Sequence, residues 1–134
     1  MNKETLQKAV ELAEEVGHVV VATADATGLP HLAAASKLSA GSDGQVTVAG
    51  WFCPGTAANV DQNRHISLVV WDPTADEGYQ LVGRVEHMVE IGVLDGYAPE
   101  VEGERLLPQV ERALVVRVDR TLRFTPAPHS DEDA

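Results

Sequence analysis

The sequence has little of what several common protein classes require. Its 134 residues include one cysteine, Cys53, and only 4% aromatic residues. A single thiol cannot form an internal disulfide, and it fits a reducing compartment. No apolar run approaches the length that spans a bilayer, and no charged and apolar leader opens the sequence. We therefore expect a cytoplasmic protein with no membrane partner.

Basic residues are also scarce, with 10 Lys and Arg against 21 Asp and Glu and a formal net charge of −11. Because nucleic-acid binding depends on cations that neutralise phosphates, we expect no nucleic-acid partner. Any anionic ligand must be held by local amides, hydroxyls or a few placed cations. The five histidines never recur at metal-ligand spacing, so no metal site is expected.

The chain length suits one domain, which we place at residues 1–125. Residues 2–16 carry apolar side chains at helical spacing, with Asn2 as the N-cap and Gly17 as the end. Residues 126–134 are acidic and interrupted by proline, and we expect a disordered tail. Six β-type runs lie between these ends, at 18–24, 31–36, 45–50, 65–71, 79–91 and 113–125.

The fifth of these runs is the longest and alternates strictly between its two faces. Leu81, Gly83, Val85, His87, Val89 and Ile91 fall on one face of it. A strand of this length in a small domain is expected to bend, with Gly83 easing the curve. A short helix is expected between Pro108 and Ala113. Six short strands with few helices favour a small antiparallel barrel or a sandwich, and periodicity does not separate the two.

Residues 18–32 form the most informative stretch. A short β-branched run is followed by Asp25 and Gly28, which supply a capped turn and a residue free to take positive φ. Pro30 then begins a second apolar run, because it cannot donate to a ladder. This pattern predicts a β-hairpin.

Residues 49–70 form a second informative stretch, in which a strand, a glycine-bearing loop, a helix and another strand follow in order. The helix is expected to begin near Thr56, which has the side chain of an N-cap. A helix start also offers free amides and the positive end of a dipole to an anion. A simple cap and an anion site both remain open from the residues alone.

The A-T-x-D-x-x-G-x-P-H string of the hairpin and the T-x-x-N helix that precedes an N-x-x-x-S-L strand resemble the pyridoxamine 5′-phosphate oxidase-like flavoproteins. The resemblance covers about residues 17–91, with a weaker match at 111–116. It implies a split antiparallel β-barrel with an N-terminal helix and a short connecting helix. It also implies FMN, bound in a groove between the two subunits of a homodimer.

The resemblance also implies a set of cofactor-binding residues. Thr56 would bond the phosphate, and Asn59 would support the turn or the ribityl chain. The resemblance further implies a set of ring-lining or cofactor-facing positions: Ala34, Ala35, Ser36, Ala49, Gly50, Trp51 and Gln80. From the residues alone, these side chains could instead serve tight sheet packing, the core, an interface or an exposed strand surface.

The chain departs from the family pattern at Gly55, where the family has a lysine before the threonine. Loss of that cation weakens a phosphate site by a few kcal/mol, in the range of about 1.5–3 kcal/mol for a charged hydrogen bond. We expect Lys37 to supply the missing charge, with Arg64 as the reserve. Cys53 has no base assigned to it and is expected to be a packed thiol.

The resemblance implies redox chemistry in which the flavin carries the electrons. No residue is assigned as a general acid or base, which favours a small redox or electron-transfer protein. The alternative is a non-catalytic binding module, a sensor or carrier, that has lost FMN. A deazaflavin or haem in the same groove lies between these two functions.

Overall fold

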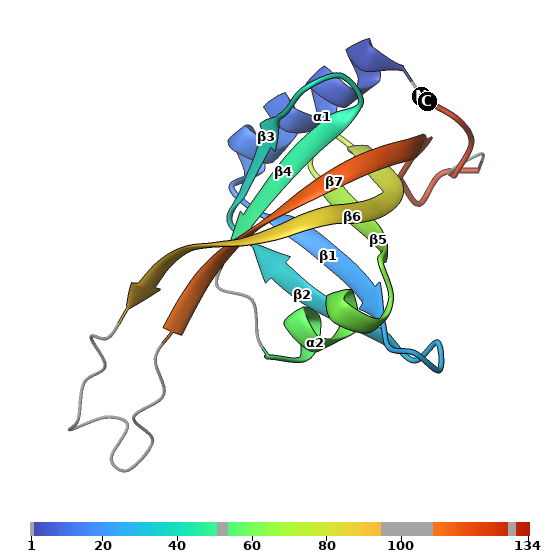
Figure 1. Cartoon of the computed structure of the whole chain (residues 1–134). Coiled ribbons are helices and arrows are strands. Elements are labelled where there is room, and N and C mark those ends of the chain that lie inside the picture. Colours follow the sequence, from blue (N-terminus) through green and yellow to red (C-terminus); the bar gives the residue numbers. More distant parts are fainter. Residues whose placement is uncertain (1, 51–53, 95–108, 129–130) are drawn as a thin grey trace, which may run out of the picture.

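The structure is a computed structural model of the chain and describes residues 2–50, 54–94, 109–128 and 131–134. Trp51, Phe52 and Cys53 therefore lie outside the described residues. The elements in chain order are α1 (Lys3–Val16), β1 (Val19–Ala24), β2 (Pro30–Ala35), β3 (Lys37–Ala40), β4 (Gln45–Gly50), α2 (Pro54–Gln62), β5 (His65–Asp72), β6 (Glu77–Leu94) and β7 (Gln109–Arg123) (Figure 1).

The strands form one antiparallel sheet in the order β2-β1-β5-β6-β7-β4-β3. The sheet curls into a half-barrel, and the long β6–β7 hairpin extends from it as an arm (Figure 1). The two sheet edges approach each other after β2, where the Ser36 amide donates to the Ala49 carbonyl at 3.1 Å. The mainly β fold with an N-terminal helix and a short second helix is confirmed.

The core fills the inside of the curl. Val21, Leu68 and Leu81 are paired across β1, β5 and β6, and each is fully buried. Leu12 of α1 and Val60 of α2 join the same core, and the two helices lie at opposite ends of the half-barrel (Figure 1). Within the described residues, neither helix combines the length and apolar character needed to cross a bilayer.

Both ends of α1 have the caps that the sequence predicts. The Asn2 side chain accepts a hydrogen bond from the Glu4 amide at 2.9 Å. Gly17 takes a left-handed conformation with φ of 80°, and its amide donates to the Ala13 carbonyl. These contacts satisfy backbone groups that a helix end leaves without partners.

The β1–β2 hairpin is confirmed, and its turn is built on Asp25. The Asp25 carboxylate accepts from the Thr27 amide at 2.8 Å, the Thr27 hydroxyl at 2.7 Å and the Leu29 amide at 3.0 Å. Gly28 has φ of 93°, a conformation that glycine adopts without strain. These donors lower the pKa of the Asp25 carboxyl, the Thr27 hydroxyl most of all.

The strict alternation predicted for the fifth run is wrong beyond Val85. Val85 pairs with Val116 and His87 pairs with Val115, so Glu86 is an extra residue in β6. Such a bulge reverses the faces of the residues that follow it. Met88 packs on the core, whereas Val89 and Ile91 are about half exposed.

Other boundaries differ from the sequence predictions. Residues 109–113 belong to β7 rather than to a short helix, because they pair with β6 along the arm. Lys37–Ala40 forms a separate strand, β3, that pairs with β4. Helix α2 begins at Pro54, so Thr56 lies inside the first turn and not at the cap.

Candidate functional site

The free edge of β2 is the central feature of the candidate site. β2 pairs with β1 on one side and with no strand of the described sheet on the other. The Leu29 carbonyl accepts from Asp25 on the β1 side, whereas the Ser36 amide points away and bonds Ala49. Because backbone groups alternate along an extended strand, those of Leu32 and Ala34 also point away from β1.

One end of this edge is closed by the end of β4. A β-carbon at Gly50 would lie 3.0 Å from Cα and 3.1 Å from Cβ of Ala35. Few real side chains approach a neighbouring residue this closely, so glycine allows the end of β4 to lie against β2 without displacing Ala35. The structure therefore brings together Ala35, Ser36, Ala49 and Gly50, four of the cofactor-lining positions that the resemblance implies.

The other end of the edge lies against the first turn of α2. A β-carbon at Gly55 would lie 3.3 Å from Nε2 of His31, at the start of β2. Gly55 and Gly50 thus mark two points on β2 that are four residues apart, about 13 Å along an extended strand. This spacing suits an elongated ligand with one end at α2 and the other at the end of β4.

Thr56 and Asn59 belong to the helix that covers this end. Thr56 is only 1% exposed, within the first turn of α2. The Asn59 side-chain amide donates to the hydroxyl of the buried Thr23 at 3.1 Å. Asn59 therefore links α2 to β1, and its role toward the turn or the ribityl chain stays a prediction. The first turn of α2 contains no acidic residue, so it keeps the positive end of its dipole.

Ala34 and Ala35 lie on opposite faces of β2, because successive side chains of a strand alternate. Ala35 is buried in the core, and Ala34 is exposed on the outer face. Both side chains cannot line one face of a ring. Their backbone and the Ala34 methyl group remain available to a ligand at the strand edge.

Lys37 lies on the outer face at the other sheet edge. Cross-strand pairing places Lys37 beside Ala49, Ala49 beside Ala113, and Ala113 beside Val89. The side chain of Lys37 is exposed, and its pairing places it by Ala49 rather than by α2. Arg64 follows the end of α2 and is distant from its first turn.

Gln80 is the residue that the structure separates from the others. It lies on β6, in the cross-strand row Ala34–Val20–Val69–Gln80. Three strand spacings, about 14 Å, therefore separate it from Ala34. Its side-chain amide donates to the Ser67 hydroxyl at 3.2 Å, so within one chain Gln80 does not join the β2 edge.

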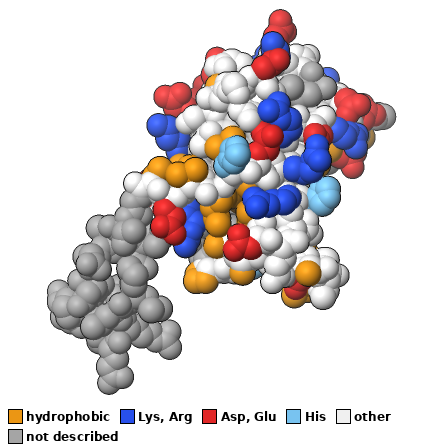
Figure 2. Space-filling view, in the orientation of Figure 1, with side chains coloured by type: hydrophobic (Ala, Val, Ile, Leu, Met, Phe, Trp, Pro, Cys, Tyr) orange, Lys and Arg blue, Asp and Glu red, His pale blue; other side chains and the backbone are white. Residues whose placement is uncertain are grey.

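The outer face of the sheet is largely apolar near the β2 edge and near the arm. Leu32 is 68% exposed, and Val89 and Ile91 are 47% and 52% exposed. Figure 2 shows hydrophobic side chains near the base of the β6–β7 arm, with basic side chains beside them on the barrel. Exposed apolar patches of this kind mark interaction surfaces.

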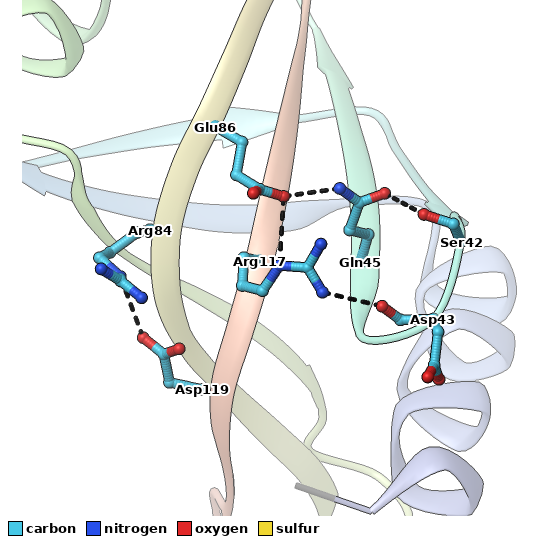
Figure 3. Close-up of polar contacts among 7 residues, drawn as sticks. All are labelled: Ser42, Asp43, Gln45, Arg84, Glu86, Arg117 and Asp119. Carbon is cyan, nitrogen blue, oxygen red and sulfur yellow. Dashed lines mark hydrogen bonds and ion pairs between the residues drawn. The ribbon is translucent and has the colours of Figure 1, made fainter.

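Two basic side chains on this face, Arg117 and Arg84, are paired with acids. Glu86 forms an ion pair with Arg117 at 3.3 Å and accepts a hydrogen bond from Gln45 at 2.6 Å (Figure 3). Arg84 pairs with Asp119 at 3.5 Å. The Gln45 amide, and then Arg117, lower the pKa of the Glu86 carboxyl. These contacts join β4, β6 and β7 at the bulge, and they leave these arginines poorly suited to an anionic ligand.

Sequence reasoning missed one residue at this site, His31. Its imidazole lies against Gly55, the position at which the family lysine is absent. The Pro-His step was part of the hairpin motif, but sequence spacing alone did not show that β2 begins beside α2. The described part of the chain gathers no group of three His, Cys, Asp or Glu side chains suited to a metal ion.

The family model for pyridoxamine 5′-phosphate oxidase matches residues 5–120. No curated protein sequence matches the chain. An FMN-binding protein from Syntrophomonas wolfei subsp. wolfei has a TM-score of 0.68 at 18% identity, covering 95% of this chain and 90% of that chain.

Two other solved structures with this fold are named for different ligands. An F420 reductase has a TM-score of 0.58 at 17% identity, covering 83% of this chain and 93% of that chain. HutZ, the haem storage protein of Vibrio cholerae, has a TM-score of 0.55 at 16% identity, covering 93% and 95%. At these identities the structures show the shared fold, while the family match spans most of the sequence. The chain belongs to the pyridoxamine 5′-phosphate oxidase family.

Proposed function

We propose that the chain binds FMN along the free edge of β2 and acts as a small flavin-dependent redox protein. The observation that carries the proposal is that two glycines lie against β2 at residues four positions apart, Ala35 and His31. Gly50 lies against Ala35, and Gly55 lies against His31. The family match and the FMN-binding structural relative support the same cofactor.

The flavin ring belongs at the Ala35 end of the edge. A flavin carries hydrogen-bonding groups along one side of its ring system, and a strand edge offers alternating amides and carbonyls. The backbone groups of Leu32 and Ala34 point to this side of β2. The small side chains of residues 33–35 allow a flat ring to approach the backbone closely.

The phosphate belongs at the first turn of α2. The free amides of a helix start and the positive end of its dipole bind anions. Gly55 leaves the backbone approachable, and the backbone amide of Thr56 lies in the same turn. Because the net charge of the chain is −11, the phosphate also needs a local cation or donor.

Two side chains are candidates for that local group. Lys37 is a permanent cation, but it lies beside Ala49 at the far end of β2. His31 lies against Gly55 at the near end, and an imidazole N–H donates hydrogen bonds. Within one chain, Lys37 lies farther from the first turn of α2 than its side chain can reach, because about 13 Å of β2 separates Ala35 from His31. We therefore propose that Lys37 meets the phosphate held by the partner subunit, and we treat His31 as the candidate within the same chain.

A second copy of the chain completes the site in this proposal. The outer face carries Leu32, Ala22, Ser67 and Val82 in one cross-strand row. Leu32 ends this row and is 68% exposed, a feature typical of an interface. One small barrel cannot enclose a tricyclic ring and its tail, so the groove requires a partner subunit. Gln80, on the same face, would then serve the interface or the ring of the second site.

The chemistry of the site favours electron transfer. Bound FMN supplies one- and two-electron chemistry, and the protein supplies position and polarity. The residues along the β2 edge are Leu32 and the alanines 33–35, which position a ring and exclude water. Such side chains perform no proton transfer, which fits a redox carrier or a small reductase.

A non-catalytic binding module is the second candidate function, and Gly55 is the observation that favours it. Without the lysine of the family, the groove suits a ligand that carries its charge elsewhere. The F420 reductase and the haem storage protein HutZ suggest the two alternative ligands, a deazaflavin and haem.

Reconstitution of the purified chain separates these functions. The apoprotein is mixed with equimolar FMN, deazaflavin and haem, freed of unbound ligand, and examined by absorbance. We expect the flavin spectrum, at one FMN per subunit. Retention of haem or the deazaflavin in its place would overturn the FMN assignment. Retention of none of the three would favour a module that has lost the cofactor.

A further inference from the structure

Strand β7 extends beyond its neighbour β4. Pairing between the two strands runs from Arg112 to Arg117, and the Val118 amide then donates to the Gly44 carbonyl. On its other side, β7 stays paired with β6 as far as Arg123. Residues 119–123 therefore present a strand edge that β4 does not cover, which we name the β7 edge.

Residues 131–134, which we name the acidic segment, lie on the β7 edge. The Arg123 amide donates to the Glu132 carbonyl at 2.9 Å, and the Asp131 amide donates to the Arg123 carbonyl at 2.9 Å. The Ala134 amide donates to the Thr121 carbonyl at 3.0 Å. An antiparallel bridge joins Leu122 and Asp133 between these bonds. The acidic, proline-interrupted composition of residues 126–134 does not suggest this strand-like pairing.

Side chains add a charge preference to the backbone pairing. Arg120 forms an ion pair with Asp133 at 3.2 Å, and the Thr121 hydroxyl donates to the Ala134 carbonyl at 3.3 Å. Lys8 and Arg123 line the adjoining pocket with Ala134, although Asp76 and Glu77 line it as well. Two further cations thus lie near a segment that carries Asp131, Glu132 and Asp133.

The contacts that bind the acidic segment to the β7 edge are weak. The ion pair is exposed, with 60% of the Arg120 side chain and 78% of the Asp133 side chain accessible. Exposed ion pairs contribute little to stability, and a few backbone bonds at a sheet edge open more readily than the core. Thr121 and Leu122 are nevertheless buried, at 3% and 8% exposure, so the edge beneath is well formed.

We propose that the β7 edge is a docking site for an extended acidic segment of a partner protein, and that residues 131–134 are its resident, displaceable occupant. The binding mode is strand addition, in which backbone bonds give affinity and charged side chains give preference. The acidic side chains of residues 131–133 indicate the kind of partner segment that the site prefers. Since the site lies on β7 away from the β2 edge, the proposal stands apart from FMN binding.

The tether gives the resident segment an advantage over a free partner. Seven residues, 124–130, join Arg123 to Asp131, and short linkers produce effective concentrations in the millimolar range. A partner segment therefore binds well only after the resident segment has been released. The acidic segment thereby acts as an autoinhibitory strand.

A double variant releases the segment without shortening the chain. Asp131→Pro and Ala134→Pro remove two of the three backbone donors between the segment and β7. Asp131 also has φ of 65°, which proline cannot adopt. We expect the Arg123 amide to exchange its hydrogen at least about ten-fold faster in this variant, because its acceptor has been displaced. Unchanged exchange would overturn the resident role of the segment.

The probe is a synthetic peptide with the sequence of residues 125–134, titrated into labelled protein and followed by NMR. We expect it to shift the amide signals of Thr121, Leu122 and Arg123 in the double variant. We expect at least about ten-fold weaker binding to the unmodified chain, where the tethered segment competes. Equal binding to both proteins, or no shift at these residues in the double variant, would overturn the proposal.

Charge preference is tested with matched reagents. A peptide with Asn and Gln in place of the three acids is expected to bind the double variant several-fold more weakly. Adding Arg120→Gln to the double variant is expected to weaken the acidic peptide to a similar extent. Equal binding of the neutral and acidic peptides would overturn the preference for an acidic partner. Unchanged signals from β1 and β5 show that each variant keeps its fold.

Discussion

At the scale of single residues, Asp25 shows how one side chain fixes a hairpin. The Thr27 hydroxyl and the Leu29 amide hold the pKa of its carboxyl below the ordinary value. A carboxyl with a lowered folded-state pKa contributes stability above its unfolded pKa of about 3.9. That contribution is lost as the pH falls through the folded-state pKa.

We therefore predict that Asp25→Ala lowers the melting temperature at neutral pH and has little effect at the acid end of the titration. Asp25→Asn retains an acceptor oxygen and is expected to lower the melting temperature less. Thermal unfolding between neutral pH and the acid limit measures both differences. A destabilisation by Asp25→Ala that is the same at every pH would contradict this account.

The cation that accompanies the phosphate is also a question of single residues. We predict that Lys37→Ala weakens FMN binding about ten-fold, because a charged hydrogen bond contributes about 1.5–3 kcal/mol. Riboflavin, which lacks the phosphate, is expected to bind unchanged. Lys8→Ala, an exposed lysine on α1, is the control. An unchanged FMN affinity in Lys37→Ala would contradict the assignment and leave His31 as the group to test.

At the scale of elements, the bend of β6 depends on Gly83. A β-carbon there would lie 2.0 Å from the Arg117 carbonyl oxygen, and the register between β6 and β7 shifts at this point. The sequence predicts that Gly83 eases the curve, and the close approach shows the physical reason. A side chain at residue 83 has to push the two strands apart.

We predict that Gly83→Ala destabilises the fold by about 1–3 kcal/mol, the range for overpacking. Arg84→Ala is the control, because its ion pair with Asp119 is exposed and contributes at most about 1 kcal/mol. Urea unfolding of the two variants gives both values. A loss at Gly83 no larger than that at Arg84 would show that the strands accommodate the methyl group.

Many of the helices and strands can be predicted from the sequence. Helical spacing and caps predicted α1, and turn chemistry predicted the β1–β2 hairpin. The bulge at Glu86 was not readable, because strict alternation continues through it in the sequence. The helix predicted between Pro108 and Ala113 is wrong, because residues 109–113 form a strand that pairing with β6 stabilises. Their mixed polarity and the neighbouring Pro108 do not indicate this pairing.

Part of the candidate site can be predicted from the sequence. The resemblance implies that Ala35, Ser36, Ala49 and Gly50 belong to one site, and in the structure these four residues lie close together, while their contact with a cofactor stays a prediction. Opposite faces for Ala34 and Ala35 follow from strand geometry once the strand is fixed. The contact between His31 and Gly55 depends on how α2 docks, which local sequence does not determine.

At the scale of the whole molecule, the outer sheet face leads to a prediction about assembly. We predict a homodimer at micromolar concentration, and we expect Leu32→Asp to dissociate it by placing a charge in an apolar row. Leu29→Asp is the matched control, because Leu29 is equally exposed but lies in the β1–β2 turn. Light scattering that reports a monomer for the unmodified chain would contradict both the dimer and a shared groove.

The central claim is that the first turn of α2 binds the phosphate of FMN, and a paired titration tests it most directly. FMN and riboflavin, which differ only in the phosphate, are titrated into the apoprotein and followed by fluorescence quenching. We predict that FMN binds at least about ten-fold more tightly, equivalent to 1.4 kcal/mol or more from the phosphate contacts. Equal affinities for FMN and riboflavin would contradict the account.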